Sequence, residues 1–304
     1  MRYIFITNGR ADKQAVNERI SQMVSETASE MDWELYVTKA PGDATLFVRR
    51  HCEEHLSAPI CYVACGGDGM INEVASGLVG MKDKYLAIIA VGTGNDFVKY
   101  YPDHDFRSIR GILNGSAREI DIMKINDSRY SINVCNVGFE AAVCSIANRI
   151  SANGVTDAYR KGLIMGILKH RFDKITVTAD GERLNRRRLL LCTMANNRYV
   201  GGEYCCAPKS VNDDGLMDVC LIRPILLIEL VLIISIYRNG RHLDSSICKP
   251  LLKYRRAKHV EVHSEEETEI CLDGEMYAGR DFTVDILPGA INLIIPNTKN
   301  LFLK

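Results

Sequence analysis

Three glycines and one aspartate stand together in Gly66-Gly67-Asp68-Gly69, directly after the apolar run Ile60 to Ala64. This pattern predicts a strand that ends in a glycine-rich turn, followed by a helix. Glycines allow backbone N–H groups to approach anionic oxygens closely, and a helix N-terminus attracts negative charge, so the turn is suited to binding phosphate. The carboxylate of Asp68 would repel phosphate unless a hard cation such as Mg²⁺ bridged them. The turn therefore indicates phosphoryl transfer as well as nucleotide binding.

A second glycine turn, Thr93-Gly94-Asn95-Asp96, follows the apolar run Ala87 to Val91. It offers a hydroxyl, an amide and a carboxylate beside small residues. Taken alone, it is equally well explained as a tight turn that caps a helix through Asn95 or Asp96. At the same end of the same sheet as the first turn, it would supply polar groups and an acid for a nucleotide and Mg²⁺.

Two carboxylates lie near the C-terminus in Asp273-Gly274-Glu275. In an extended segment, alternate residues face the same side, so the two acids would lie together. One could then stay ionised and orient the other, which would accept a proton from an attacking hydroxyl. The alternative is a solvated hairpin, because Asp-Gly is a strong turn pair.

A further acidic turn is Asp213-Asp214-Gly215-Leu216-Met217-Asp218. Its carboxylate and loop carbonyl oxygens are of the kind that bind Mg²⁺ or Ca²⁺. A plain turn explains the same residues.

The elements that position these turns differ between the two halves of the chain. In residues 1–121, short apolar runs alternate with helical periods, which predicts an α/β nucleotide-binding domain with a mainly parallel sheet. Loops at Asn8, Thr38, Gly66 and Gly92 each follow an expected strand, so they should converge on one crevice at the carboxyl ends of the strands. Residues 122–304 show short strand-like segments, such as Tyr130 to Val137, with turn signals between them, which predicts a β-rich, antiparallel, sandwich-like domain. Its last apolar segment, Ile291 to Ile295, could return to the first domain.

Bulk composition narrows the class of protein. The 304 residues are 47% hydrophobic and 25% charged, as expected of a folded globular protein, and Lys+Arg equals Asp+Glu at 38 each, so no excess charge favours nucleic acid. Eleven cysteines at irregular spacing fit reduced thiols in the cytoplasm.

Membrane contact is expected to be peripheral. The longest apolar run, Ile225 to Ile236, is too short to cross a bilayer, and it predicts either a buried helix or a helix that touches the membrane surface. Three basic clusters are solvated faces or contacts for anionic headgroups; they are Lys169-His170-Arg171, Arg186-Arg187-Arg188 and Lys253-Tyr254-Arg255-Arg256.

Taken together, the four turns resemble the diacylglycerol kinase catalytic-domain family, which includes sphingosine and ceramide kinases and bacterial soluble lipid kinases. The resemblance runs nearly end to end, and the motifs stand in family order. They are Gly66-Gly67-Asp68-Gly69 with Asn72-Glu73, Thr93-Gly94-Asn95-Asp96-Phe97, Asp214-Gly215-Leu216-Met217-Asp218 and Asp273-Gly274-Glu275. The resemblance implies an ATP-dependent, magnesium-requiring kinase of a lipid hydroxyl, with diacylglycerol as the family's usual substrate and a homodimer as a plausible assembly.

The same resemblance implies roles for individual residues. Glu275 would be the general base, oriented by Asp273, and Asp68 would serve catalysis. Magnesium near ATP would be organised by Asp68, Asp96 and Asp121, and a separate structural magnesium would be held by Val211, Asp214 and Leu216. ATP would be bound by Asn8, Gly9, Thr38, Gly66, Gly67, Asp68, Gly69, Asn72, Thr93, Gly94 and Asn95.

Two residues depart from the family pattern. Met70 stands where the first turn ordinarily ends in threonine, which removes a hydroxyl from the phosphate neighbourhood, and Asn8-Gly9 stands where the family has Asn-Pro. Two alternatives stay open, the first because NAD kinases also have a Gly-Gly-Asp-Gly turn and the second because of Met70. One is a kinase of a soluble substrate, of NAD kinase type, and the other is a nucleotide- or lipid-binding protein without catalysis.

Overall fold

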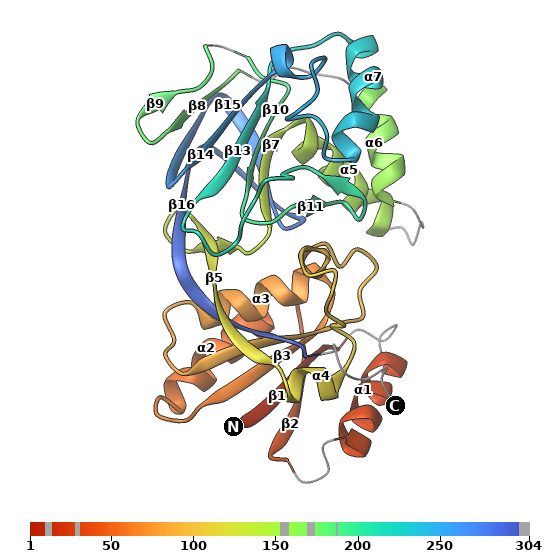
Figure 1. Cartoon of the computed structure of the whole chain (residues 1–304), viewed down its shortest axis with the longest axis vertical. Coiled ribbons are helices and arrows are strands. Elements are labelled where there is room, and N and C mark those ends of the chain that lie inside the picture. The colour runs from red at the N-terminus through yellow and green to blue at the C-terminus, as the bar shows by residue number, and fades with distance from the viewer. Residues whose placement is uncertain (10–13, 28–30, 153–157, 169–173, 187, 298–304) are drawn as a thin grey trace. The chain divides into compact units, whose positions relative to one another are not determined.

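A computed structural model of the chain describes residues 1–9, 14–27, 31–152, 158–168, 174–186 and 188–297 (Figure 1). The chain divides into two compact units. Unit 1 contains Met1–Asp121 and Gly289–Lys304, and unit 2 contains Ile122–Pro288. Two strands, β5 (Ser116–Ile125) and β16 (Glu275–Ile295), continue from one unit into the other.

Unit 1 is built on a parallel sheet. Its strands are β1 (Arg2–Asn8), β2 (Trp33–Thr38), β3 (Ile60–Gly66) and β4 (Lys84–Ala90), in the order β2-β1-β3-β4. The last part of β16 adds a fifth parallel strand, since Asn292 and Leu293 pair with Tyr85 and Leu86 of β4. The central strand β3 is buried in every residue from Ile60 to Cys65, as expected of a parallel strand covered on both faces.

Helices cover both faces of this sheet. They are α1 (Gln14–Thr27), α2 (Asp43–Glu54), α3 (Asp68–Leu78), the 3-10 helix η2 (Phe97–Tyr100) and α4 (Ile109–Leu113). Ile20 of α1 and Ile109 of α4 pack on Cys61 and Val63. Tyr62, which alternates with these residues and so faces the other side of β3, bonds to His51 of α2. The expected α/β sheet with helices on both faces is confirmed.

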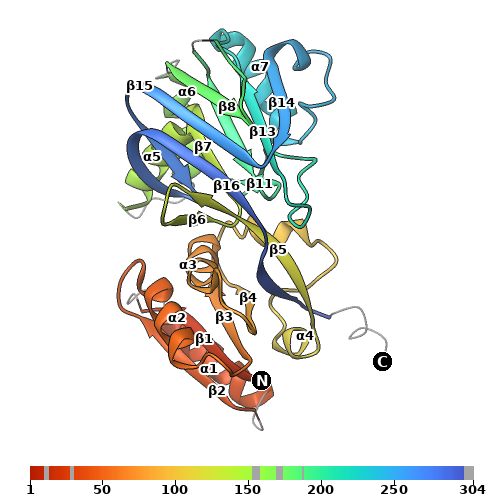
Figure 2. The ribbon, with the colours of Figure 1, turned by 90° about the vertical axis from the view of Figure 1, so that its left-hand side faces the viewer.

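Unit 2 is mainly antiparallel. Its strands are β6 (Arg129–Ser131), β7 (Val134–Gly138), β8 (Ile175–Ala179), β9 (Glu182–Arg183), β10 (Leu191–Ala195), β11 (Tyr199–Val200), β12 (Tyr204–Cys205), β13 (Met217–Ile222), β14 (Leu252–Ala257), β15 (His259–Leu272) and the first part of β16. The main order is β14-β13-β10-β7-β15-β16. Figure 2 shows β15 and β16 running side by side as a long hairpin.

Strand β15 joins two layers of unit 2. Its first half pairs with β8 at residues 260–264, its end pairs with β7 at residues 270–272, and an irregularity between His263 and Thr268 separates the two stretches. Inward side chains of β7, β8, β10, β13, β15 and β16 form one buried apolar cluster. The expected β-rich, sandwich-like fold is confirmed.

The helices of unit 2 are α5 (Phe139–Ala152), α6 (Ala158–Leu168), α7 (Leu227–Arg238) and the 3-10 helix η3 (Lys249–Leu251). A second apolar cluster holds α5 and α7 against β10 and β13, with Leu163 of α6 packed on it. Within the described part of the chain, no helix has the length and apolar character needed to cross a bilayer.

Two local differences from the sequence-based expectation bear on the turns. Helix α3 begins at Asp68, so the acid and Gly69 belong to its first turn instead of preceding it. The segment Tyr130 to Val137, expected as one strand, is divided into β6 and β7 at Ile132-Asn133.

Candidate active site

The ends of the parallel strands in unit 1 bring the expected ligand loops to one edge. Asn8 at the end of β1 pairs in register with Thr38 at the end of β2, and Gly66 at the end of β3 pairs with Ala90 at the end of β4. Gly9 follows Asn8 directly, and the backbone is so close there that a Cβ on Gly9 would lie 2.1 Å from the carbonyl oxygen of Thr38. Residues on four different strands therefore share the edge where α/β sheets bind ligands.

The two glycine turns touch backbone to backbone. A Cβ on Gly92 would lie 2.4 Å from Cα of Gly67, a separation that real Cβ atoms do not reach, so glycine is required there. Asn95 has φ 51° and donates a hydrogen bond from Nδ2 to the carbonyl oxygen of Gly92 at 2.7 Å. Its Oδ1 is buried and has no hydrogen-bond donor among the residues that the structure describes. This oxygen is available to a donor group of a bound ligand.

The first turn forms the N-terminus of α3. Gly67 is the N-cap residue, has an extended conformation and contributes no side-chain cap. The first N–H groups of a helix lack intrahelical acceptors, so an uncapped end with a glycine next to it presents donors suited to phosphate.

Two carboxylates meet beside the second turn. Asp68 Oδ1 accepts a hydrogen bond from the backbone N–H of Phe97 at 3.0 Å. A Cβ on Gly94 would lie 3.1 Å from Asp68 Oδ2 and 3.8 Å from Asp96 Oδ2, so both acids border the same small space. Burial, and next the negative charge of Asp96, raise the pKa of Asp68. Lys99 offsets part of this charge through an ion pair with Asp96 at 2.6 Å.

The carboxylates of Asp68 and Asp96 are suited to a magnesium ion that is bound together with phosphates. Magnesium in nucleotide sites is held by one or two carboxylates, with phosphate and water oxygens completing the shell. The described residues contain no group of three His, Cys, Asp or Glu side chains that could hold a metal by themselves. The part of Asp121 in the expected magnesium network stays a prediction. Asp121 is buried, and its Oδ1 accepts a hydrogen bond from the N–H of Gly289 at 2.8 Å, where the chain returns to unit 1.

Glu73 has a structural role that the sequence did not reveal. Its Oε2 accepts a hydrogen bond from the N–H of Ala44 at 3.1 Å, and its carbonyl oxygen accepts one from Thr45 Oγ1 at 2.8 Å. The N-cap of α2, Gly42, offers no side chain for this purpose. Glu73 therefore caps α2 from α3, and Asn72 beside it is half-buried.

Asp273 and Glu275 do not lie on one side of an extended segment. Asp273 and Gly274 have φ values of 48° and 96° and form the two-residue turn between β15 and β16, so the hairpin alternative is correct. The carboxylate of Asp273 accepts hydrogen bonds from the backbone N–H groups of Ile132, Asn133 and Val134, at 2.8, 3.1 and 2.8 Å. Asp273 therefore holds the hairpin to the β6–β7 connection, and this is why the strand expected there is broken.

Glu275 is the first residue of β16 and its side chain is exposed. It pairs in register with Leu272 across the turn, and the carbonyl oxygen of Gly274 accepts a hydrogen bond from Asn148 of α5 at 2.8 Å. Asp273 thus acts on the position of Glu275 by fixing the backbone that carries it.

Comparison with known proteins covers both units. Residues 2–125 match the family model described as diacylglycerol kinase catalytic domain, and residues 133–295 match the one described as YegS C-terminal NAD kinase beta sandwich-like domain. A protein named diacylglycerol kinase from Bacillus subtilis (strain 168) is 30% identical over 278 residues, which are 87% of this chain and 86% of that protein. The chain belongs to the diacylglycerol kinase catalytic-domain family.

Two other known proteins resemble the chain over nearly its whole length. A protein named "Probable lipid kinase YegS-like" from Serratia proteamaculans (strain 568) is 28% identical over 96% of this chain and 93% of its own length. A crystal structure titled as a diacylglycerol kinase from Bacillus anthracis str. Sterne superposes with a TM-score of 0.70 at 21% identity, covering 97% of this chain and 96% of that one, which is a likeness of fold. The expectation of an enzyme of the lipid kinase type is confirmed.

The loop assigned to a structural magnesium by resemblance to the family contains a compensated acid. Asp214 Oδ1 accepts a hydrogen bond from the N–H of Leu216 at 3.1 Å, and the other oxygen is ion-paired with Arg256. The arginine balances the charge of Asp214 without a metal. Magnesium at Val211, Asp214 and Leu216 stays a prediction.

The basic clusters are not equally available to a membrane. In the cluster Lys253-Tyr254-Arg255-Arg256, both Lys253 and Arg255 form ion pairs with Glu182, so these two cations are already partly neutralised. Arg186 and Arg188 are exposed. Lys169-His170-Arg171 and Arg187 lie outside the described residues.

A further set of polar residues was not singled out by the sequence. Glu140, Thr193 and Tyr237 are buried and hydrogen-bonded to one another in unit 2. The available signal was Glu140 itself, a lone acid within the apolar stretch from Val137 to Val143.

Substitutions of Asp273 and Glu275 should have different effects on the free energy of unfolding. Replacing Asp273 with Asn removes a charged acceptor from three backbone N–H groups, so we expect Asp273→Asn to lower the free energy of unfolding by about 1–3 kcal/mol. Glu275→Gln changes an exposed side chain and should stay within about 0.5 kcal/mol of the wild type. Urea unfolding of both variants measures the difference, and equal stability would contradict the clamp assigned to Asp273.

Proposed function

We propose that this enzyme transfers the γ-phosphoryl group of ATP to the hydroxyl of a lipid, with diacylglycerol as the first candidate and Mg²⁺ as the required ion. The observation that carries the proposal is the meeting of two glycine turns and two carboxylates, Asp68 and Asp96, at the carboxyl edge of the sheet in unit 1. Membership of the family supports ATP as the phosphoryl donor.

In this proposal the protein contributes mainly position and charge. Backbone N–H groups at the start of α3 bind phosphate oxygens, and Asp68 with Asp96 holds the metal that neutralises the phosphate charge. Asn95 Oδ1, the buried oxygen without a donor, would accept a hydrogen bond from the nucleotide. Catalysis by positioning and electrostatic stabilisation is the usual mode of phosphoryl transfer.

Glu275 is the proposed general base. The lipid hydroxyl oxygen forms a bond to the γ-phosphorus, the bond from that phosphorus to the β–γ bridging oxygen breaks, and ADP leaves. The hydroxyl proton passes to the Glu275 carboxylate, which is exposed and therefore reachable by substrate. Asp273 is a positioning residue, since its hydrogen bonds fix the turn that precedes Glu275.

The outer face of α7 is the proposed membrane contact of a cytoplasmic, peripheral enzyme. Leu230, Ile233 and Tyr237 face inward and are buried, so α7 is anchored through one side. The opposite side is apolar and exposed, with Ile228 at 62% and Leu232 at 64% of full exposure. This outer face consists of Leu226, Leu227, Ile228, Val231 and Leu232. A helix of 12 residues with such a face suits the interface between headgroups and acyl chains.

A phosphotransfer screen tests the reaction. With labelled ATP and Mg²⁺, we expect the purified chain to phosphorylate one or more of diacylglycerol, monoacylglycerol, a sphingoid base and phosphatidylglycerol, and not NAD. Asp68→Asn should lower the rate by about 100-fold or more, because a charge placed against the phosphates is lost. Asp103→Asn, a change of an exposed acid in the same unit, is the matched control.

Two outcomes of the screen would overturn the lipid reaction. Phosphorylation of NAD without transfer to any lipid would assign a soluble substrate. Nucleotide binding without turnover of any lipid on the panel would indicate a binding protein without catalysis. Met70→Thr, which restores the hydroxyl of the family pattern, would then be the first variant to test.

The base assignment is tested by kinetics. Glu275→Gln should lower kcat by about 10²- to 10⁴-fold, the usual effect of losing a general base, while KM for ATP stays unchanged. Glu269→Gln replaces an exposed glutamate on the neighbouring strand β15 and should leave kcat as it is. A Glu275→Gln enzyme with wild-type kcat would exclude this residue as the base.

Vesicle binding tests the outer face of α7. The double variant Ile228→Ser, Leu232→Ser is tested by sedimentation with phosphatidylglycerol–phosphatidylcholine vesicles. Its affinity for the vesicles should be lower by at least about tenfold, because two apolar side chains no longer enter the membrane. Leu46→Ser is the matched control, since Leu46 is 72% exposed on α2 in unit 1.

The salt dependence of the same assay separates the two kinds of contact. Binding through α7 persists at high salt, whereas binding through the basic clusters falls. Unchanged binding of the double variant would refute the α7 contact. The homodimer stays a prediction.

A further inference from the structure

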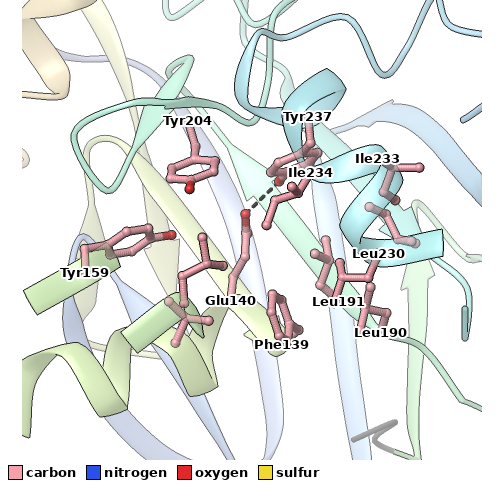
Figure 3. Close-up of a pocket in the computed structure, with 13 residues that line it drawn as sticks. Phe139, Glu140, Tyr159, Leu190, Leu191, Tyr204, Leu230, Ile233, Ile234 and Tyr237 are labelled. Atoms are coloured by element: carbon pink, nitrogen blue, oxygen red, sulfur yellow. Dashed lines mark hydrogen bonds between the residues drawn. The ribbon is translucent and has the colours of Figure 1, made fainter. Parts of the chain in front are cut away.

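Glu140 and Glu275 have opposite surroundings in unit 2. Glu140 is 5% exposed and lies beside a cavity of about 30 Å³, which has room for about one or two water molecules. The hydroxyl of Tyr237 donates a hydrogen bond to it at 2.7 Å (Figure 3). Glu275 is exposed at the start of β16. Of these two acids, only Glu275 has space beside it for a group as large as a phosphate.

Tyr277 lies on the same side of β16 as Glu275. Alternate residues of a strand face the same side, and a rise of about 3.3 Å per residue separates the two Cα atoms by about 7 Å. The ring of Tyr277 is half-buried and packs on the apolar cluster formed by β7, β8, β10, β13, β15 and β16. The ring therefore provides a fixed surface next to the exposed carboxylate.

Arg129 lies over this ring. Its guanidinium carbon is 4.3 Å from the ring centroid of Tyr277, the distance of a cation–π contact. Arg129 is the first residue of β6 and pairs in register with Ile125 of β5. The turn before it is bound to β16, because the N–H of Asn126 donates to the carbonyl oxygen of Thr283 at 2.9 Å and its Oδ1 accepts from the N–H of Thr283 at 2.8 Å. The contact thus joins two elements whose backbones are already held together.

The N–H donors of Arg129 are available to a ligand. Its side chain is exposed, and among the residues that the structure describes it forms no ion pair and donates to no acceptor. Stacking on an aromatic ring orients the guanidinium plane and uses none of its N–H groups. Within the same described residues, no cation forms an ion pair with Glu275 either. The cation and the acid therefore share one side of unit 2 without neutralising each other.

An arginine beside a general base has a defined use in phosphoryl transfer. While the base takes the proton of the hydroxyl, negative charge is spread over the oxygens of the phosphoryl group. A guanidinium binds phosphate through two parallel N–H bonds and keeps its charge at any physiological pH. Such a group stabilises the phosphate and holds it near the base.

We propose that Arg129 binds an anionic phosphate oxygen beside Glu275. The oxygen belongs to the γ-phosphoryl group of ATP or to a phosphate in the headgroup of the lipid acceptor, and the chemistry of recognition is the same for both. The proposal rests on the proposed function, since it places the anion next to the residue proposed as the general base. Tyr277 is a positioning residue, because its ring orients the guanidinium.

Two pairs of ligands distinguish these sources without requiring turnover. Magnesium complexes of ADP and of the β,γ-imido analogue of ATP differ in the γ-phosphate, and dihexanoylglycerol and dihexanoyl phosphatidylglycerol differ in the phosphate headgroup. Calorimetric titration of the full chain gives a ratio of affinities for each pair. We expect Arg129→Gln to reduce one of the two ratios by about tenfold or more, because a charge-assisted bond to phosphate is lost.

Matched variants separate charge from packing. Arg129→Lys keeps a positive charge without the planar fork and should restore part of the ratio, whereas Arg129→Met keeps a long side chain over Tyr277 and should behave like Arg129→Gln. Tyr277→Leu removes the orienting ring and should give a smaller loss in the same ratio. Arg280 is an exposed arginine of β16 that strand alternation places on the side opposite to Glu275, so Arg280→Gln should leave both ratios unchanged.

Kinetics identify the source of the phosphate in an active enzyme. Arg129→Gln should lower kcat/KM for the lipid by about tenfold or more. An equal loss with diacylglycerol and phosphatidylglycerol assigns Arg129 to the γ-phosphoryl group, and a loss with phosphatidylglycerol alone assigns it to the headgroup.

The outcomes are distinguishable from those of the kinase test. Unchanged ratios in both ligand pairs, together with unchanged kcat/KM in an active enzyme, would overturn the anion site and leave Arg129 as a cover for Tyr277. In a protein without phosphotransfer, a reduced ratio keeps the site although the kinase reaction is lost, and two unchanged ratios overturn the site as well.

Discussion

The contact between Gly67 and Gly92 sets the geometry of the nucleotide-binding edge. Two turns that follow neighbouring parallel strands approach to this distance because Gly92 has no side chain, and a Cβ on Gly67 would also be tight, at 3.2 Å from Cα of Gly92. Their approach brings Asp68, at the start of α3, next to the loop that contains Gly94 and Asp96. The two carboxylates lie close enough that the charge of Asp96 contributes to the raised pKa of Asp68. A cation would relieve this repulsion, so the edge is suitable for a metal-bound phosphate.

Much of unit 1 could be predicted from the sequence, because parallel strands give continuous apolar runs and glycine turns mark where they end. Unit 2 was predictable as a class, since alternating strands and turn signals indicate antiparallel sheets. The family membership followed from four short motifs in order. These signals are local in sequence, and each depends on backbone requirements that few residue types satisfy.

The contacts that were missed join residues far apart in the chain. For Asp273, the missed contacts are with three N–H groups about 140 positions earlier, which donate hydrogen bonds to its carboxylate. Glu73 was read as part of the phosphate motif, whereas its side chain caps α2. Asp121, which was assigned to magnesium, accepts a hydrogen bond from the N–H of Gly289 that was not expected. In each case the acid satisfies buried backbone donors, and single-sequence patterns contain no information on which donors those will be.

The return of the chain to unit 1 has a consequence for how the protein is made. Strands β1 to β4 emerge early from the ribosome, yet the strand that covers the free edge of β4 comes from residues near 292, after all of unit 2 has been synthesised. Until then β4 presents unpaired backbone groups, and Asp121 has no Gly289 to bind. The nucleotide-binding unit therefore completes its sheet last, although most of its sequence is translated first. A nascent chain must keep the edge of β4 from pairing elsewhere for the time needed to make about 200 residues.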